Sequence, residues 1–146
     1  MLNIKELIEA GHVISLSGNH YVKYSGLVAI AHMKGIKGIK TEILIQDVIS
    51  EDRIQEEQIE ENGIKTIIKT VKTCRVMIRA TVFGLDGEEF TSIATATQYN
   101  LKKNMLPYIY EMAETRAKAR ALRDFVGIGL TAWEELPEYE PERPQK

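Results

Sequence analysis

The sequence has very little cysteine: Cys74 is the only one among 146 residues. A single thiol supplies neither a disulfide framework within the chain nor a cluster of thiolates that could hold a metal. No apolar run reaches the length that crosses a bilayer. The first residues lack the charged and then apolar pattern of a secretory signal. We therefore expect a cytoplasmic protein that has no membrane partner.

A dominant sign of charge is also lacking, because 19 lysines and arginines face 21 aspartates and glutamates, for a net charge of -2. This balance argues weakly against nucleic acid as a partner. The average hides a segregation, however. Acid gathers in residues 51–61 and 134–142, and base gathers in residues 65–79 and 102–123. A binding face can therefore be basic although the whole chain is nearly neutral.

Catalytic motifs are missing as well. The sequence has no G-x-x-x-x-G-K-[ST] loop, no G-x-G-x-x-G after a strand and no nucleophile with a base and an orienting group. His12 and His20 are expected to face each other across a hairpin, a spacing that could hold a metal, but no third ligand is evident. We expect a protein that is not an enzyme and that has no cofactor and no metal.

The strongest pattern that is present is a helix over residues 105–129. Pro107 fits its first turn, and Gly127 and Gly129 fit its end. At helical spacing one stripe of this segment is mostly apolar and predicts the side that packs on the core. Its members are Tyr108, Met112, Thr115, Ala119, Leu122 and Val126.

A row of arginines runs beside this stripe. Arg116, Arg120 and Arg123 share one flank of the helix, and Lys118 pairs with Glu114 on the far side. Always-charged, forked guanidinium groups in a row are typical of a surface that grips phosphates. Two alternatives stay open: a solvated edge of the helix, or arginines held by acidic neighbours from elsewhere in the fold.

The order of the remaining patterns predicts the fold class. It is α+β: an antiparallel β-β-β sheet with an N-terminal helix and hairpin, a buried helix, and a long C-terminal helix packed on one face. Residues 1–133 form one domain, and residues 134–146 form an acidic, proline-rich, disordered tail. The expected elements before the long helix are a helix at 3–10, a hairpin at 12–24, a helix opening at Ser25 or Gly26, a strand at 41–48, a mobile connection at 50–63, and strands at 65–83 and 88–98.

The strand at 65–83 has two unlike faces. Counting by twos, one face is mostly apolar, includes Cys74 and should meet the helices, whereas the other carries Lys69, Arg75 and Arg79. A strand of this length is expected to bend or to contain a bulge. Together with Lys23 and Tyr24 at the end of the first hairpin, the basic face and the arginine row would form a groove for single-stranded nucleic acid. Half-buried strand packing is the alternative for the tyrosine.

Two stretches carry a family resemblance, YVKYSGLVAIAHMKGIKGI and ETRAKARALRDFVGIGL. With the order of elements, they resemble the single-strand annealing proteins, above all the Rad fifty-two group of recombination mediators, with phage ERF and RecT-type annealing proteins as more distant relatives. The likeness covers nearly the whole chain up to Trp133.

The resemblance implies that single-stranded DNA lies in a positive groove of an oligomeric ring, and that annealing needs neither ATP nor a catalytic metal. By position, Arg120 and Arg123 match the family's basic residues on the long helix, and Tyr24 lies within a residue of its hairpin-end tyrosine. Ala119 stands where the family has a lysine, and Arg116 or Lys118 would compensate. The acidic segment 51–61 is a second departure.

The resulting hypothesis is a homo-oligomer that binds and anneals single-stranded DNA in recombination or repair, and that meets a recombination partner through its acidic tail. The alternatives are an oligomeric adaptor that binds no nucleic acid, and a small hydrolase that uses His12 or His20. The residues predicted to bind DNA are Lys23, Tyr24, Lys69, Arg75, Arg79, Arg116, Lys118, Arg120 and Arg123.

Overall fold

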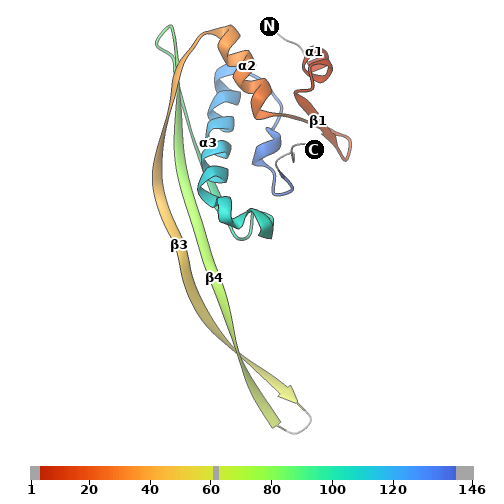
Figure 1. Cartoon of the computed structure of the whole chain (residues 1–146), viewed down its shortest axis with the longest axis vertical. Helices are drawn as coiled ribbons and strands as arrows, with labels where there is room; N and C mark the ends of the chain where they lie inside the picture. The colour runs from red at the N-terminus through yellow and green to blue at the C-terminus, as the bar shows by residue number, and fades with distance from the viewer. Residues whose placement is uncertain (1–3, 61–62, 141–146) are drawn as a thin grey trace, which may run out of the picture.

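The computed structural model describes residues 4–60 and 63–140, and the side chains of 48–60 and 64–73 lie outside the described part. Its architecture confirms the predicted α+β class, with α3 packed on the sheet (Figure 1). The elements follow in the order α1 (Ile4–Glu9), β1 (Val13–Leu16), β2 (Asn19–Val22), α2 (Tyr24–Lys34), β3 (Ile36–Glu60), β4 (Gly63–Gly84), β5 (Glu89–Thr97), the 3-10 helix η1 (Lys103–Tyr108), α3 (Ile109–Val126) and the 3-10 helix η2 (Trp133–Glu135).

The main sheet is antiparallel and has the order β3-β4-β5, while β1 and β2 form a separate hairpin. The predicted alternation of β4 is confirmed next to β5, where Val76, Ile78, Ala80 and Val82 are buried. These side chains meet α3, which itself contains four fully buried alanines. Small side chains on the helix let it approach the sheet closely, so the core lies between α3 and β4–β5.

The long helix starts differently from the expectation. Residues Lys103–Tyr108 form a 3-10 turn that contains Pro107, and the α-helix begins at Ile109. Pro107 has no N–H to donate, so a tight first turn accommodates it more readily than a helix interior would. The predicted stop is confirmed, because Gly127 has the left-handed φ of 72° and donates its N–H to the Arg123 carbonyl.

The prediction of a mobile connection at 50–63 is wrong for residues 50–60, because their backbone is strand. Register pairs run without a shift from Ser50 with Thr73 to Glu60 with Gly63. Pairing with β5 covers only Arg75–Phe83 of β4, so beyond it β3 and β4 continue past α3 as a two-stranded arm (Figure 1). Strand alternation in a sequence reports one buried face. The two-stranded arm extends beyond α3 and β5, so its sequence need not alternate between apolar and polar residues.

The sequence predicted a bend or bulge in the strand at 65–83, but the irregularities lie in the neighbouring strand β3. Register shifts occur in β3, between Ile36 and Gly38, between Ile43 and Ile45, and between Asp47 and Ser50. The extra residues bend β3, which is an edge strand of the sheet. Bulges of this kind also blunt an edge against pairing with other chains.

The second helix is buried on one side only, so the expectation of burial nearly all round is wrong. Leu27 and Ala31 are fully buried, but Met33 is 64% exposed. The helix begins at Tyr24 and ends at Gly35, which has φ 105°. Lys34 near that end donates to the carbonyl of Phe125 in α3, which joins the two helices. Among the described helices, none is long and apolar enough to cross a membrane.

Phe125 is the largest fully buried side chain, and its ring meets Phe90 of β5 edge to face at 5.8 Å between centroids. We expect Phe125→Ala to lower the free energy of unfolding by about 3–5 kcal/mol, because it leaves a cavity between α3 and the sheet. Urea denaturation measures this change. The control is Tyr99→Ala, at a ring that is 83% exposed, for which we expect a change within about 0.5 kcal/mol. Equal effects would contradict the described core.

Candidate nucleic-acid interface

Arg116 lies inside the protein, although the sequence predicted it on a phosphate-binding surface. Only 3% of the residue is exposed. Its guanidinium donates to the carbonyls of Thr95 at 3.2 Å, Asn100 at 2.7 Å, Glu134 at 3.2 Å and Leu136 at 3.4 Å. It also donates to Asn100 Oδ1 at 2.9 Å. All three of its nitrogens are therefore engaged, so the predicted exposed position of Arg116 is wrong.

Keeping Arg116 charged in this buried position costs desolvation free energy. Burial lowers the pKa of Arg116, and the nearby Glu135 carboxylate raises it in part. A guanidinium stays protonated in proteins because its ordinary pKa is so high. Arg116 is therefore a buried cation whose hydrogen bonds tie α3 to the end of β5 and to the residues after Ala132.

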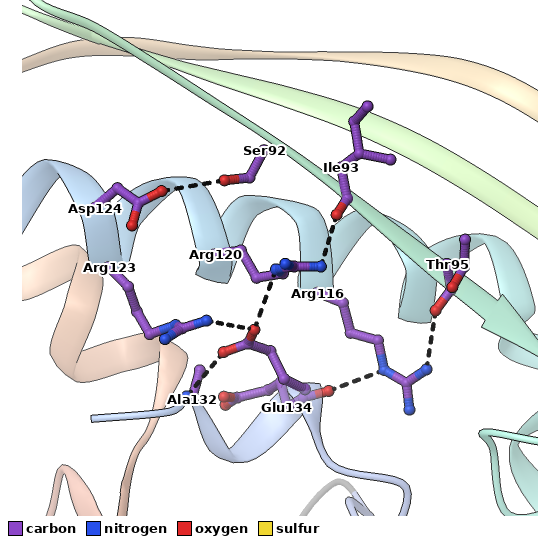
Figure 2. A network of polar contacts seen from close by, with 10 residues as sticks. Ser92, Ile93, Thr95, Arg116, Arg120, Arg123, Asp124, Ala132 and Glu134 are labelled. Carbon is purple, nitrogen blue, oxygen red and sulfur yellow. Dashed lines mark hydrogen bonds and ion pairs between the residues drawn. The ribbon is translucent and has the colours of Figure 1, made fainter. Parts of the chain in front are cut away.

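The other two arginines of the row share one carboxylate. Glu135 Oε1 lies 2.8 Å from Arg123 Nη2 and 3.6 Å from Arg120 Nε. Glu135 Oε2 accepts the N–H of Ala132 at 2.9 Å. Figure 2 shows the three arginines reaching from α3 toward β5 and toward the segment around Glu134. The alternative of arginines held by acidic neighbours is thus confirmed for Arg120 and Arg123.

These side chains also close the outer edge of β5. Arg120 donates to the Ile93 carbonyl at 2.8 Å, and Arg116 donates to the Thr95 carbonyl (Figure 2). Asn100 Oδ1 accepts the N–H of Thr97 at 2.7 Å. Unpaired groups at a sheet edge invite pairing with other strands unless side chains or bulges cover them. Arg116 and Arg120 therefore cover part of the edge of the sheet from α3.

The basic face of β4 does not join the arginine row, which corrects the predicted groove. Because Val76 and Ile78 are buried beneath α3, the alternating side chains of Arg75 and Arg79 lie on the opposite face of the sheet. Arg75 pairs with Asp47 at 2.6 Å. The backbone of Lys69 lies in the arm opposite Ile54, and its side chain is outside the described part.

Arg79 is neutralised across strands as well. It lies 2.8 Å from Glu42, and Lys40 lies 3.3 Å from the same carboxylate. Hydrogen bonds from Arg79 and Lys40 lower the pKa of Glu42. Exposed ion pairs of this kind contribute little to stability, but they leave less positive charge for a phosphate.

The prediction of a disordered tail from Glu134 is wrong for residues 134–140, because residues 131–140 pack on the domain. We call these residues the C-terminal strap. Val22 donates its N–H to the Thr131 carbonyl at 3.1 Å. Trp133–Glu135 form the η2 turn, and Glu134 is 7% exposed. Residues 141–146 lie outside the described part.

Glu134 caps α2 from a distant part of the chain. Its two carboxylate oxygens accept the N–H of Tyr24 at 2.9 and 3.0 Å, while the N-cap residue Lys23 supplies no side-chain cap of its own. Anionic groups are favourable at a helix N-terminus. Burial nevertheless raises the pKa of Glu134, and its hydrogen bond from Tyr24 lowers the pKa only in part.

A cleft of about 420 Å³ opens where the strap, α2 and α3 meet. Its walls include Lys23, Tyr24, Trp133 and Tyr139. The rings of Trp133 and Tyr139 meet edge to face at 6.0 Å, with an interplanar angle of 82°. Three aromatic rings beside a lysine form a surface on which a nucleobase can stack. The cleft brings two of the predicted site residues, Lys23 and Tyr24, beside the rings of Trp133 and Tyr139.

Lys118 interacts electrostatically with Tyr24, one of the residues that line the cleft. Burial raises the pKa of Tyr24, and the charge of Lys118 lowers it in part. The predicted pair of Lys118 with Glu114 is confirmed at 2.6 Å. Of the nine residues predicted to bind DNA, Lys23 and Tyr24 line the cleft, and Lys118 interacts electrostatically with Tyr24. Arg75, Arg79, Arg116 and Arg123 are engaged with oxygens of the fold, whereas Arg120 makes one hydrogen bond, to the Ile93 carbonyl.

The two hairpin histidines do not face each other. Strand register pairs His20 with Ser15, and the Nδ1 and Oγ atoms of these residues lie 2.9 Å apart. His12 precedes β1 and contacts Ser25 Oγ at 3.2 Å. The expected opposition is wrong because the register is fixed by Val13 with Val22. Within the described ranges, no group of three potential ligands is close enough for a metal.

Sequence reasoning missed the aromatic and acidic residues after α3. Glu134, Glu135 and Tyr139 were assigned to the tail because acid and proline dominate its composition, and Trp133 was only the last residue of the predicted domain. A signal was present: a tryptophan and a tyrosine spaced six residues apart are unusual in a segment that stays solvated.

Comparisons with known proteins assign no family. None of the sequence models of known families matches the chain. No curated protein matches it in a sequence search.

The many bonds of Arg116 predict a large cost for a conservative change. Arg116→Lys leaves several buried carbonyls without a donor, so we expect the free energy of unfolding to fall by about 2–4 kcal/mol. Arg120→Lys changes a side chain that is 49% exposed, so a fall below about 1 kcal/mol is expected. Urea denaturation of both variants decides the matter. Similar losses would show that Arg116 does not tie the strap to α3.

The raised pKa of Glu134 predicts a dependence of stability on pH. Its folded-state pKa lies above the ordinary value of 4.5. The folded protein therefore holds this proton more firmly, and the contribution to stability is full below that value and is lost as the pH rises through the raised pKa. Glu134→Gln removes the titration and keeps an acceptor for Tyr24. In urea denaturation across this range, the stability of wild type relative to the variant should fall as pH rises. A constant difference would refute the assignment.

Proposed function

We propose that this protein binds single-stranded DNA and promotes its annealing in recombination or repair, as a cytoplasmic homo-oligomer that needs neither ATP nor a metal. The observation that carries the proposal is the cleft that joins Lys23 to the rings of Tyr24, Trp133 and Tyr139. Single-stranded nucleic acid is bound by positive groups that meet phosphates and by aromatic side chains that stack on bases.

The order of elements supports the same proposal. The resemblance to annealing proteins was based in part on a predicted order of hairpin, helix, three-stranded meander and long helix, and the chain has these elements in that order. Lys23 and Tyr24, at the junction of the first hairpin and α2, belong to the stretch that carried the resemblance. Fold alone does not establish function, so the proposal depends on the cleft.

The cleft suggests how a strand would be held. Bases would stack on the rings, while Lys23 and Lys118 would attract the adjacent phosphates. Glu134 and Glu140 also line the cleft, so its net charge is modest and stacking supplies most of the affinity. A base held by its face keeps its pairing edge available, which is the requirement for annealing to a second strand.

An oligomeric adaptor that binds no nucleic acid is the second candidate. The observation that favours it is the internal pairing of Arg75, Arg79 and Arg123 with carboxylates. The long arm formed by β3 and β4 would then serve contacts between copies. Light scattering that detects an assembly, together with no shift of an oligo-dT strand in a gel, would favour this alternative.

The binding experiment measures the affinity of the full chain for fluorescent oligo-dT as a function of salt. We expect Tyr139→Ala to weaken binding roughly tenfold through the loss of one stacked base. Lys23→Ala should lower the slope of log affinity against log salt by about 0.7, the value for one phosphate contact on a single strand.

Matched controls keep the interpretation specific. Lys37→Ala removes the same charge from an exposed residue beyond the opposite end of α2, and Tyr99→Ala removes an exposed ring after β5. Both controls should bind like wild type. If Lys23→Ala and Tyr139→Ala also leave affinity and slope unchanged, the cleft is not the binding surface.

A further inference from the structure

A second, smaller cavity lies beside the arginine row. It measures about 190 Å³ and lies between the end of β5 and α3, bordered by Thr95, Asn100, Arg116, Arg120 and Glu135. A water molecule occupies roughly 30 Å³ of liquid, so the space accommodates a small anion such as a phosphate group. Its lining is polar apart from Ala94, and two cations border it.

The two cations differ in how many of their hydrogen-bond donors remain unused. Each nitrogen of Arg116 already donates to an oxygen of Thr95, Asn100 or the strap. Arg120 makes one hydrogen bond, from Nη1 to the Ile93 carbonyl. Its Nε lies 3.6 Å from Glu135, which is beyond hydrogen-bond distance. Among the described residues, Arg120 is thus the cation at this cavity with donors to spare.

Glu135 is an imperfect partner for both arginines that it serves. One of its oxygens is shared between Arg120 and Arg123, and the other accepts the Ala132 N–H. Arg123 Nε is buried and has no hydrogen-bond partner within the described part of the chain. A single carboxylate therefore faces two guanidinium groups and satisfies neither completely.

We propose that this cavity is a phosphate site whose main ligand is Arg120, and that the Glu135 carboxylate competes with the phosphate for that arginine. The site deepens the proposed function and rests on it for the identity of the ligand: in that setting the phosphate belongs to the backbone of the single strand. Free phosphate compounds have the same chemistry, so the test separates the two sources.

The central variant is Glu135→Gln, which removes the competing charge and keeps an oxygen for the Ala132 N–H. Glu138→Gln is the matched control, because it removes the same charge from an exposed residue of the strap. Pyrophosphate is the first probe, and its apparent Kd follows from the rise in Tm with concentration. We expect this Kd to fall by about two- to fivefold in Glu135→Gln, the range of a partly exposed ion pair, and to stay unchanged in Glu138→Gln.

Arg120→Gln in the otherwise wild-type chain provides the second variant, and it is informative even if Glu135→Gln fails to fold. It should abolish stabilisation by pyrophosphate, since the main ligand is gone. Stabilisation that persists in Arg120→Gln, or that is equal in Glu135→Gln and Glu138→Gln, would overturn the site.

Oligo-dT is the second probe and separates this inference from the proposed function. With Arg120→Gln the salt slope should flatten by about 0.7, as expected for the loss of one phosphate contact. If all variants bind oligo-dT with one slope and none responds to pyrophosphate, the site is refuted and the proposed function stands. If pyrophosphate acts as expected but no variant binds oligo-dT, the site stands as a free-phosphate site and the proposed function is refuted.

Discussion

The buried guanidinium of Arg116 is the interaction on which the rest of this structure depends. It joins three parts of the chain that share no strand ladder: the end of β5, the turn at Asn100 and the C-terminal strap. A buried cation is tolerated only where its donors are satisfied, because an unpaired one would carry a large desolvation cost. The positions of Thr95, Asn100 and Leu136 are therefore constrained together, and the strap belongs to the domain.

Once the strap is fixed by Arg116, two of its four glutamates, Glu134 and Glu135, lie next to positively charged groups. Glu134 accepts the N–H of Tyr24 at the N-terminus of α2, and Glu135 lies between Arg120 and Arg123. The cleft and the small cavity are consequences of this docking, because each is walled on one side by strap residues. The same contact thus organises the core edge, the cap of α2 and both candidate sites.

Much of the fold could be predicted from the sequence because burial leaves a periodic trace. The alternation around Val76 and Val82 and the end of the helix at Gly127 were both predictable, since each follows from local geometry. The spacing of Arg116, Arg120 and Arg123 correctly placed them on one flank of a helix. It carried no information on which oxygens that flank would meet, since those oxygens lie in β5 and the strap.

Composition misled at both acidic segments. Residues 50–63 and the chain from Glu134 on were predicted to be solvated chain, because acid without clear periodicity is the usual signature of such chain. The first segment instead pairs by backbone with β4, and pairing of this kind makes no demand on side-chain type. In the strap, Glu135 forms an ion pair with Arg123 of α3. The segregation of charge along the sequence therefore reflects, in part, ion pairs within the fold.

This internal neutralisation shapes how the proposed DNA binding would work. A protein that spends its arginines on its own carboxylates has few cations left for phosphates, so each protomer would hold a strand weakly and chiefly by stacking. Repetition compensates for weak sites, since linked sites on one strand raise the overall affinity far beyond that of a single site. In a homo-oligomer, many contacts that break easily would keep a strand bound while leaving each base free to find its complement. Annealing requires this combination, and it explains why a nearly neutral chain is compatible with a polynucleotide partner.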